Sequence, residues 1–188
     1  MNKEKIKGIT VMVMLMALIA VATLIIQIPT PGTNGYVHPG DSLIFFSAIF
    51  FGRKYGFVAG GVGSALADLI SGYAFWAPWT FIIKSIMGLI VGVLAYYEQG
   101  KLFNVRNILA MVAGTTILVF GYFLVSSQMQ GGVAAAITGI PGNIMQGIVG
   151  MILFYLIGYP LDKVNIKNKI MKTFQSLETR LFQFSFLA

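Results

Sequence analysis

Residues Ile9–Ile28 read ITVMVMLMALIAVATLIIQI, a run of 20 positions without a charged side chain. A helix that crosses the hydrocarbon core of a bilayer needs about 20 predominantly apolar residues. The run ends at Pro29-Thr30-Pro31-Gly32, where proline and glycine interrupt helical structure. This stretch therefore predicts a transmembrane helix near the start of the chain, and it decides the class of fold.

Five further apolar segments follow the first. Charged, proline-rich or glycine-rich residues separate them, and each predicts a helix: Ser42–Gly52, Tyr55–Gly72, Ala77–Tyr97, Ile108–Val125 and Gly142–Tyr159. We expect the intervals Pro29–Gly40 and Ser126–Pro141 to be loops, and the first of them to act as a lid.

The segment Ser42–Gly52 is too short to cross a membrane by itself. We expect it to begin within the membrane, with Pro39-Gly40-Asp41-Ser42 as its capped N-terminus. A broken backbone at that depth is tolerated only where it is buried in protein or lines a cavity. The sequence therefore predicts a cavity near His38 and Asp41.

Composition excludes most soluble classes of protein. The chain has 188 residues, of which 57% are hydrophobic and 10% are charged, whereas soluble domains average about 25% charged residues. It is too apolar to be disordered. The absence of cysteine excludes disulfides and thiolate chemistry, and His38 is the only histidine. We therefore expect no cofactor and no metal site.

The placement of the basic residues predicts the topology. If the six segments all cross, 12 of the 13 Lys and Arg residues lie on one side of the membrane. Loops rich in Lys and Arg face the cytoplasm. We therefore predict an all-α membrane protein with six transmembrane helices in residues 1–161, a basic cytoplasmic tail in residues 162–188 and both termini in the cytoplasm of a bacterial cell. The net charge of +7 then reflects topology, and no nucleic-acid partner is expected.

Small residues predict how the helices pack, because helices in lipid associate through close contact rather than through the hydrophobic effect. Gly56 with Gly60, and Gly88 with Gly92, have the spacing of such contacts, and the third helix is expected to be central. A second patch of small residues lies in the first helix and is able to pack inside the bundle or against another membrane protein: Ala17, Ala20 and Ala22.

Two ionisable residues, Asp68 and Lys84, lie inside predicted helices, where charge is costly and usually functional. The topology brings both toward the side that holds His38 and Asp41, so the four are expected to meet at one extracellular site. Two structural alternatives remain open: Asp68 and Lys84 neutralise each other as a buried pair, or His38 is bonded to its own loop.

Aromatic and amide side chains gather on the same side. Tyr36, Tyr73, Trp76 and Trp79 form either an interfacial belt or a stacking wall for a flat ring. Amides near the sixth helix are able to orient a polar ligand. The full candidate site is Tyr36, His38, Asp41, Asp68, Tyr73, Trp76, Trp79, Lys84, Asn143 and Gln146.

Four motifs in order carry a resemblance to a known family: Gly40-Asp41, Gly52-Arg53-Lys54-Tyr55-Gly56, Ala67-Asp68-Leu69-Ile70-Ser71-Gly72-Tyr73 and the later Lys84. Over about residues 8–160 the chain resembles the S components of energy-coupling factor (ECF) vitamin transporters, in particular the hydroxymethylpyrimidine and pyridoxine branch. Those relatives carry Asn-Leu before Gly-Asp, where this chain has His38-Pro39.

The resemblance implies a six-helix subunit that captures a vitamin from outside and associates with a transmembrane coupling protein and two ATPases. It also implies docking through Ala-x-x-x-Ala on the first helix, whereas Ala17 and Ala20 here are three apart. An enzyme is not expected, because no set of base and nucleophile is found. A stand-alone carrier or channel for a small polar aromatic solute, and an assembly protein without a ligand, remain alternatives.

Overall fold

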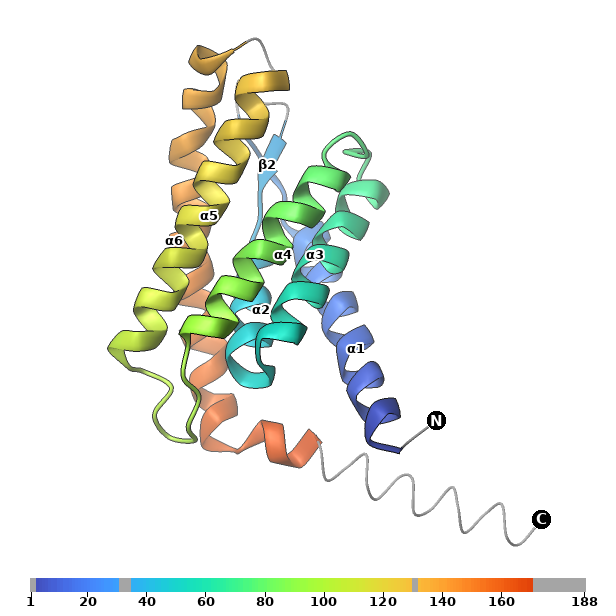
Figure 1. Ribbon diagram of the computed structural model, residues 1–188, viewed down its shortest axis with the longest axis vertical. Helices are drawn as coiled ribbons and strands as arrows, with labels where there is room; N and C mark the ends of the chain where they lie inside the picture. The colour runs from blue at the N-terminus through green and yellow to red at the C-terminus, as the bar shows by residue number, and fades with distance from the viewer. Residues whose placement is uncertain (1–2, 31–34, 130–131, 171–188) are drawn as a thin grey trace, which may run out of the picture.

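The computed structural model describes residues 3–30, 35–129 and 132–170, and most of these are helical. The helices lie alongside one another as a bundle, and a two-stranded sheet sits between them (Figure 1). The elements in chain order are α1 (Lys3–Ile25), β1 (Ile28–Thr30), β2 (Gly35–Val37), α2 (Asp41–Phe46), the π-helix η1 (Ser47–Phe51), α3 (Arg53–Ile70), α4 (Ala77–Leu94), α5 (Val105–Met129) and α6 (Val133–Lys163).

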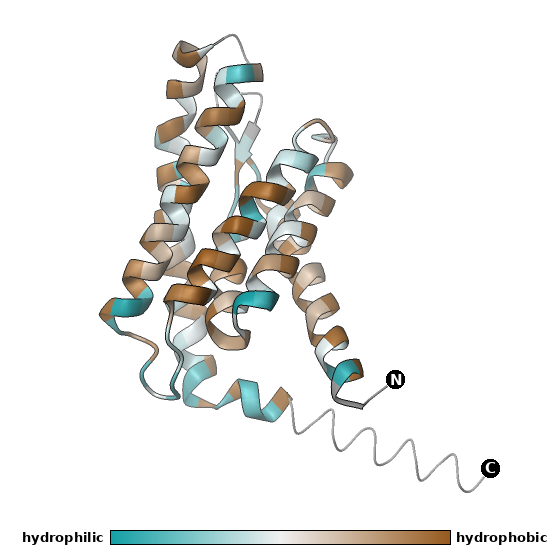
Figure 2. Cartoon of the chain, in the orientation of Figure 1, coloured by the Kyte–Doolittle hydropathy of each residue, from teal (hydrophilic) through white to brown (hydrophobic). Residues whose placement is uncertain are grey.

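The fold is that of a helical membrane protein. Four helices, α1, α4, α5 and α6, are long and apolar enough to cross a bilayer. The fifth long helix, α3, has 18 residues but carries Arg53, Lys54 and Asp68. Figure 2 shows hydrophobic residues along the middle of the helices and hydrophilic residues mainly near their ends. The predicted all-α membrane class is thus supported, while six crossings remain a prediction.

The start of α1 and the end of α6 lie at the same end of the bundle (Figure 1). We call this the basic end, because it carries Lys5, Arg53, Lys54, Lys101 and Lys163. Contacts join its parts: a Cβ on Gly92 of α4 would lie 2.5 Å from the Cα of Arg53, and the Gly100 N–H donates to Asp162 at 2.9 Å. The opposite end, formed by the end of α3, the start of α4 and the start of α6, is called the pocket end.

The short second segment begins at Asp41, one residue before the predicted Ser42. Helices α2 and η1 together cover residues Asp41–Phe51, about 17 Å at 1.5 Å per residue, which is half of a bilayer core of about 30 Å. The chain reaches Asp41 through the extended strand β2. The N-cap residue is Gly40, inside the stretch expected to cap the segment, and no side chain makes a capping hydrogen bond there.

Part of the interval expected to be a loop is a β-hairpin. Strands β1 and β2 pair antiparallel, with Ile28 opposite Val37 and Thr30 opposite Gly35. Residues 31–34 of the predicted lid lie outside the described part of the chain. The hairpin leads the chain back toward the centre of the bundle, and it thereby delivers Tyr36 and His38 to the pocket end.

The expected loop at Ser126–Pro141 is wrong over most of its length. Helix α5 continues to Met129, and α6 already begins at Val133 and runs through Pro141. Residues 130–131 lie outside the described part. Proline removes one backbone hydrogen bond, but it is tolerated in membrane helices where neighbouring structure supports the backbone. As a result, Gly139 and Asn143 stand on one helix beside Gln146.

Helix α3 is central, as its small residues predict. It packs against α4 through backbone contact: a Cβ on Gly56 would lie 2.5 Å from the Gly88 carbonyl oxygen, and a Cβ on Gly61 would lie 3.0 Å from the Phe81 carbonyl oxygen. On another side, a Cβ on Gly63 would lie 2.7 Å from the carbonyl oxygen of Met16 in α1. These contacts need glycine because no side chain fits between the two backbones.

The small patch on α1 is not a single surface. Ala20 is buried at 8% exposure, Ala22 is half-buried and Ala17 is exposed. The three residues therefore point in different directions, and only Ala17 stands on the outer face of α1. Helix α6 ends at Lys163, two residues into the expected tail. Residues 171–188 of that tail lie outside the described part of the chain.

Candidate functional site

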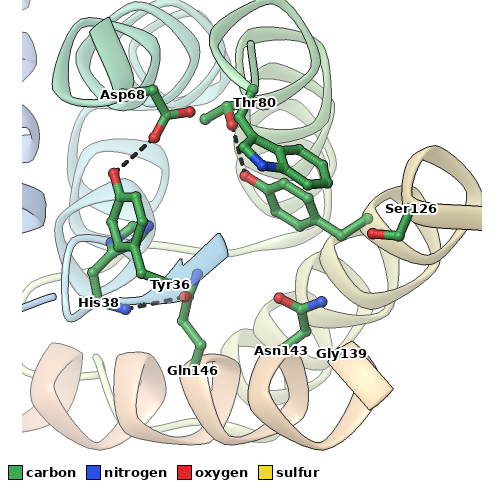
Figure 3. Close-up of a pocket in the computed structure, with 10 residues that line it drawn as sticks. Tyr36, His38, Asp68, Thr80, Ser126, Gly139, Asn143 and Gln146 are labelled. Atoms are coloured by element: carbon green, nitrogen blue, oxygen red, sulfur yellow. Dashed lines mark hydrogen bonds between the residues drawn. The ribbon is translucent and has the colours of Figure 1, made fainter. Parts of the chain in front are cut away.

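A pocket opens at the pocket end of the bundle, between β2 and the helices α3, α4, α5 and α6 (Figure 3). The empty space within it, including its open mouth, is about 530 Å³. The lining residues are Tyr36, His38, Asp68, Trp76, Thr80, Tyr122, Ser126, Gly139, Asn143 and Gln146.

An ion pair lies beneath the pocket and is closed to solvent. Lys84 Nζ of α4 donates to Asp41 Oδ1 at 2.5 Å, and both side chains are 0% exposed. The second carboxylate oxygen, Asp41 Oδ2, accepts from Gln146 Nε2 at 2.8 Å. Gln146 Oε1 in turn accepts from the backbone N–H of His38 at 3.1 Å. The network therefore joins α2, α4, α6 and the chain that follows β2.

A second carboxylate borders the pocket itself. The Tyr36 hydroxyl donates to Asp68 Oδ1 at 2.7 Å. Burial raises the pKa of Tyr36 well above its ordinary value, and the neighbouring Asp68 raises it further, so that the hydroxyl stays protonated. Asp68 Oδ2 is buried without a hydrogen-bond partner among the described residues. The nearby hydroxyl of Thr80 pairs with that of Tyr122 at 3.0 Å.

Six of the ten predicted site residues line the pocket: Tyr36, His38, Asp68, Trp76, Asn143 and Gln146. Asp41 and Lys84 lie behind it as the buried pair. The alternative that paired Lys84 with Asp68 is wrong, because Asp41 is the salt-bridge partner of Lys84.

The remaining two predicted residues are aromatic and lie outside the lining. Tyr73 packs on Tyr36 with ring centroids 4.7 Å apart, so it supports a lining residue from behind. Trp79 is 37% exposed and does not line the pocket. The expected aromatic wall is thus provided by Tyr36, Trp76 and Tyr122, and the rings of the last two meet edge to face at 5.9 Å.

Four lining residues were not foreseen from the sequence: Thr80, Tyr122, Ser126 and Gly139. Tyr122 and Ser126 are four apart on α5, and Gly139, Asn143 and Gln146 follow each other at four and three on α6. Such spacing places residues on one helix face. A stripe of polar residues along these apolar helices was therefore the feature of the sequence that indicated a pocket wall. The stripe was missed because Ser126–Pro141 was expected to be a loop and not part of two helices.

His38 is held as a neutral side chain at the edge of this site. Its Nδ1 accepts from the backbone N–H of Gly40 at 3.2 Å, which confirms the alternative of a loop-bonded histidine. Burial lowers the pKa of His38 to about 3, the Lys84 ammonium lowers it further, and Asp41 opposes the shift. An imidazolium at this place would lose hydration and face a cation.

We expect acid to destabilise the protein through His38. Its pKa is lower in the folded than in the unfolded state, so the unfolded chain binds the proton first and stability falls as the pH drops below about 6.5. At pH 5 the loss is about 2 kcal/mol. Thermal unfolding in detergent from pH 7 to pH 4.5 measures it, with His38→Gln as the matched variant. Equal pH slopes for the two proteins would contradict this assignment.

Comparison with known proteins agrees with this architecture. A sequence model of the family described as "ECF-type riboflavin transporter, S component" matches residues 3–163. This chain is a member of that family. S components are non-catalytic transporter subunits, so the chain is not an enzyme. No cluster of three or more His, Cys, Asp or Glu side chains that suits a metal ion occurs among the described residues.

Several relatives of this S component align with it over nearly their whole length. An uncharacterized protein of Pyrococcus woesei is 38% identical over 145 residues, covering 77% of this chain and 95% of the relative. The thiamine precursor transporter HmpT of Lactococcus lactis subsp. cremoris is 27% identical over 173 residues, covering 92% and 98%. A UPF0397 protein of Streptococcus agalactiae is 26% identical over 166 residues, covering 81% and 91%.

Proposed function

We propose that this S component captures a small heteroaromatic vitamin or vitamin precursor, of the hydroxymethylpyrimidine or pyridoxine kind, on the outer side of a bacterial plasma membrane. The observation that carries the proposal is the pocket at the end opposite the basic residues, with polar groups set among aromatic rings. Lys and Arg mark the cytoplasmic side of membrane proteins. A pocket at the other end is therefore placed to receive solutes from outside.

The polar lining supports a ligand with several hydrogen-bonding groups on a flat ring. Asn143 and Gln146 present amides from α6, and Asp68 presents a carboxylate oxygen from α3. Trp76 and Tyr122 supply aromatic surface, against which a planar ring packs favourably. The relative HmpT is described as a thiamine precursor transporter, which agrees with a single pyrimidine ring.

The hairpin β1–β2 supports a role as a lid. Tyr36 on β2 both lines the pocket and bonds to Asp68 across it. The same strand continues to His38, whose backbone is tied to Gln146 on the far wall. These contacts tie the strand to both walls of the site, and a movement that broke them would expose the ligand to the outer medium.

Import would require partners, because the sequence contains no nucleotide-binding motif. We propose a transmembrane coupling protein and two ATPase subunits, as in ECF transporters. The predicted docking residues Ala17, Ala20 and Ala22 do not share a face, and Ala17 is the one that stands exposed. Ala17 is flanked one helical turn away on each side by exposed Val13 and Val21, so this outer face of α1 is the proposed docking surface.

The decisive experiment is mass spectrometry of small molecules released from the purified S component, followed by titration with hydroxymethylpyrimidine, pyridoxine and riboflavin. Vesicles with and without the coupling protein and ATPases then separate the two transport hypotheses. Uptake that needs the ATPases supports the S-component mechanism. Equal uptake without them supports a stand-alone carrier and contradicts the proposal.

The two tryptophans provide a matched test of the site. Trp76→Leu is expected to weaken binding of the released ligand about tenfold, since it removes aromatic surface inside the pocket. Trp79→Leu removes an equal side chain that lies outside the lining, and its affinity is expected to stay within about twofold of the unmodified protein. Titration in detergent measures both. The reverse order of effects would move the ligand out of this pocket.

A further inference from the structure

Resting on the proposed function, we propose that the pocket takes its ligand as a nitrogen-base cation, with the Asp68 carboxylate as its counter-ion. The ligand class is an aromatic ring with a protonated ring nitrogen, such as an aminopyrimidine or a pyridine.

The charges around the pocket do not balance. Asp41 and Lys84 neutralise each other behind the wall, and both are fully buried. Asp68 is the other acidic residue at this end, and no Lys or Arg is among the residues that line the pocket. His38 accepts a hydrogen bond at Nδ1 from Gly40, so it supplies no positive charge. An ionised Asp68 therefore gives the pocket a net negative charge.

Asp68 is also short of hydrogen bonds. The side chain is 4% exposed, and its Oδ1 is occupied by the Tyr36 hydroxyl. Its Oδ2 lies buried without a partner among the described residues. A buried acceptor without a partner costs about 1–3 kcal/mol, and more when it is charged. A ligand N–H placed at this oxygen would remove that cost.

The neighbours of Asp68 cannot replace such a ligand. Figure 3 shows Tyr36 on one side of the carboxylate and Thr80 on the other. The Thr80 hydroxyl pairs with that of Tyr122 and also interacts with the Asp68 carboxylate, but it is uncharged. The Lys84 ammonium is engaged with Asp41. The titratable groups that face Asp68 from the packed elements are Tyr36 on β2, Lys84 on α4 and Tyr122 on α5. None of them brings an available cation to Oδ2.

The choice of ligand follows from this arrangement. A protonated ring nitrogen makes a charge-assisted hydrogen bond to a carboxylate, which is about twice as strong as a neutral one. Carboxylate or phosphate on a ligand would meet the negative charge of Asp68 and is disfavoured. A ring that is neutral in water must take up one proton from solution as it binds, and its affinity then rises as the pH falls toward the pKa of the ring.

The first test uses the unmodified S component. Calorimetric titration with hydroxymethylpyrimidine at pH 7.5, in two buffers with different ionisation enthalpies, counts the protons that are taken up. We expect close to one proton per ligand bound. The probe is then changed to the analogue in which oxygen replaces the ring's amino group, a neutral ring of nearly equal shape. The affinity of this analogue is expected to be lower than that of hydroxymethylpyrimidine by about tenfold at least.

The second test uses variants. Asp68→Asn is expected to reduce the preference for the amino ring over the oxo ring to about threefold or less, and to abolish proton uptake. Asp162→Asn is the matched control, since Asp162 is an equally buried carboxylate at the basic end, and it should leave both readouts unchanged. Tyr36→Phe is expected to weaken both ligands while the preference between them persists.

The outcomes separate this inference from the proposed function. Binding of both rings with equal affinity and no proton uptake overturns the inference and leaves vitamin capture intact. Binding of riboflavin alone overturns the inference and the proposed ligand class together, because that ring system is neutral and is not of the hydroxymethylpyrimidine or pyridoxine kind. Failure to bind any of the three vitamins overturns the proposed ligand class and this inference together. The proton count needs no variant, so a poorly folding Asp68→Asn protein does not prevent a decision.

Discussion

Replacing Lys84 with Met is expected to lower the free energy of unfolding by about 3–5 kcal/mol, the largest effect of any single substitution considered for this protein. The reason is that Asp41 would remain as a buried carboxylate without its counter-ion, since both side chains are 0% exposed. For a chain of this size the change corresponds to a fall in Tm of about 10 °C. Thermal unfolding in detergent, followed by tryptophan fluorescence, measures it.

Two controls isolate the buried charge. The double variant Lys84→Met with Asp41→Asn removes both charges and keeps an acceptor for Gln146, so most of the lost stability should return. Lys101→Met removes an equal charge from the pair with Glu98, whose side chains are 65% and 44% exposed, and it should change Tm by about 2 °C or less. A double variant as unstable as Lys84→Met would contradict the ion-pair explanation.

Replacing Gly88 with Val is expected to destabilise the bundle by about 3 kcal/mol. A Cβ at Gly88 would lie 2.1 Å from the carbonyl oxygen of Gly56, so the two helix backbones would have to separate. Because α3 also packs on α1 and on the short second segment, it cannot move away without opening other contacts. The predicted consequence is a lower Tm and a broader elution profile in size-exclusion chromatography.

The matched control for this glycine adds the same kind of side chain at an exposed helix position. Ala134 of α6 is exposed, and Ala134→Val should change stability by about 0.5 kcal/mol, the usual difference in helix propensity. Gly88→Ala should fall between the two, because even one carbon meets the Gly56 carbonyl. A Tm for Gly88→Val equal to that of the control would show that α3 and α4 do not meet at this place.

The glycine contact and the buried ion pair differ in how far the sequence alone predicts them. Glycines at helical spacing in an apolar segment indicate close helix contacts from the sequence alone, whereas the pairing of Gly56 with Gly88 is seen only in the fold. The partner of Lys84 does not follow, because Asp41 and Asp68 are both acidic and both at the right depth. Which of them meets Lys84 depends on how α2 is rotated beside α4, and rotation is set by packing in three dimensions.

The site shows the same division. Residues with an unusual cost in a membrane, such as Asp68 and His38, are recognisable because polarity there requires a reason. Trp79 lies outside the pocket lining, since an aromatic residue near a helix end serves equally well at the lipid surface. Tyr122 and Ser126 were missed because each is an ordinary residue in a transmembrane helix, and only the facing helix α6 makes them part of a pocket wall.

By itself, the sequence determined that the chain is a helical membrane protein, that α3 is central and that the functional polar groups lie at the end away from the basic residues. These properties follow from hydropathy, residue size and charge, which act locally along a chain. The tertiary structure alone decided the hairpin that carries Tyr36, the continuation of α6 through Pro141, and the division between a neutralised Asp41 and an available Asp68. The division between the two acids depends on contacts between residues 32 to 105 positions apart, which no local pattern records.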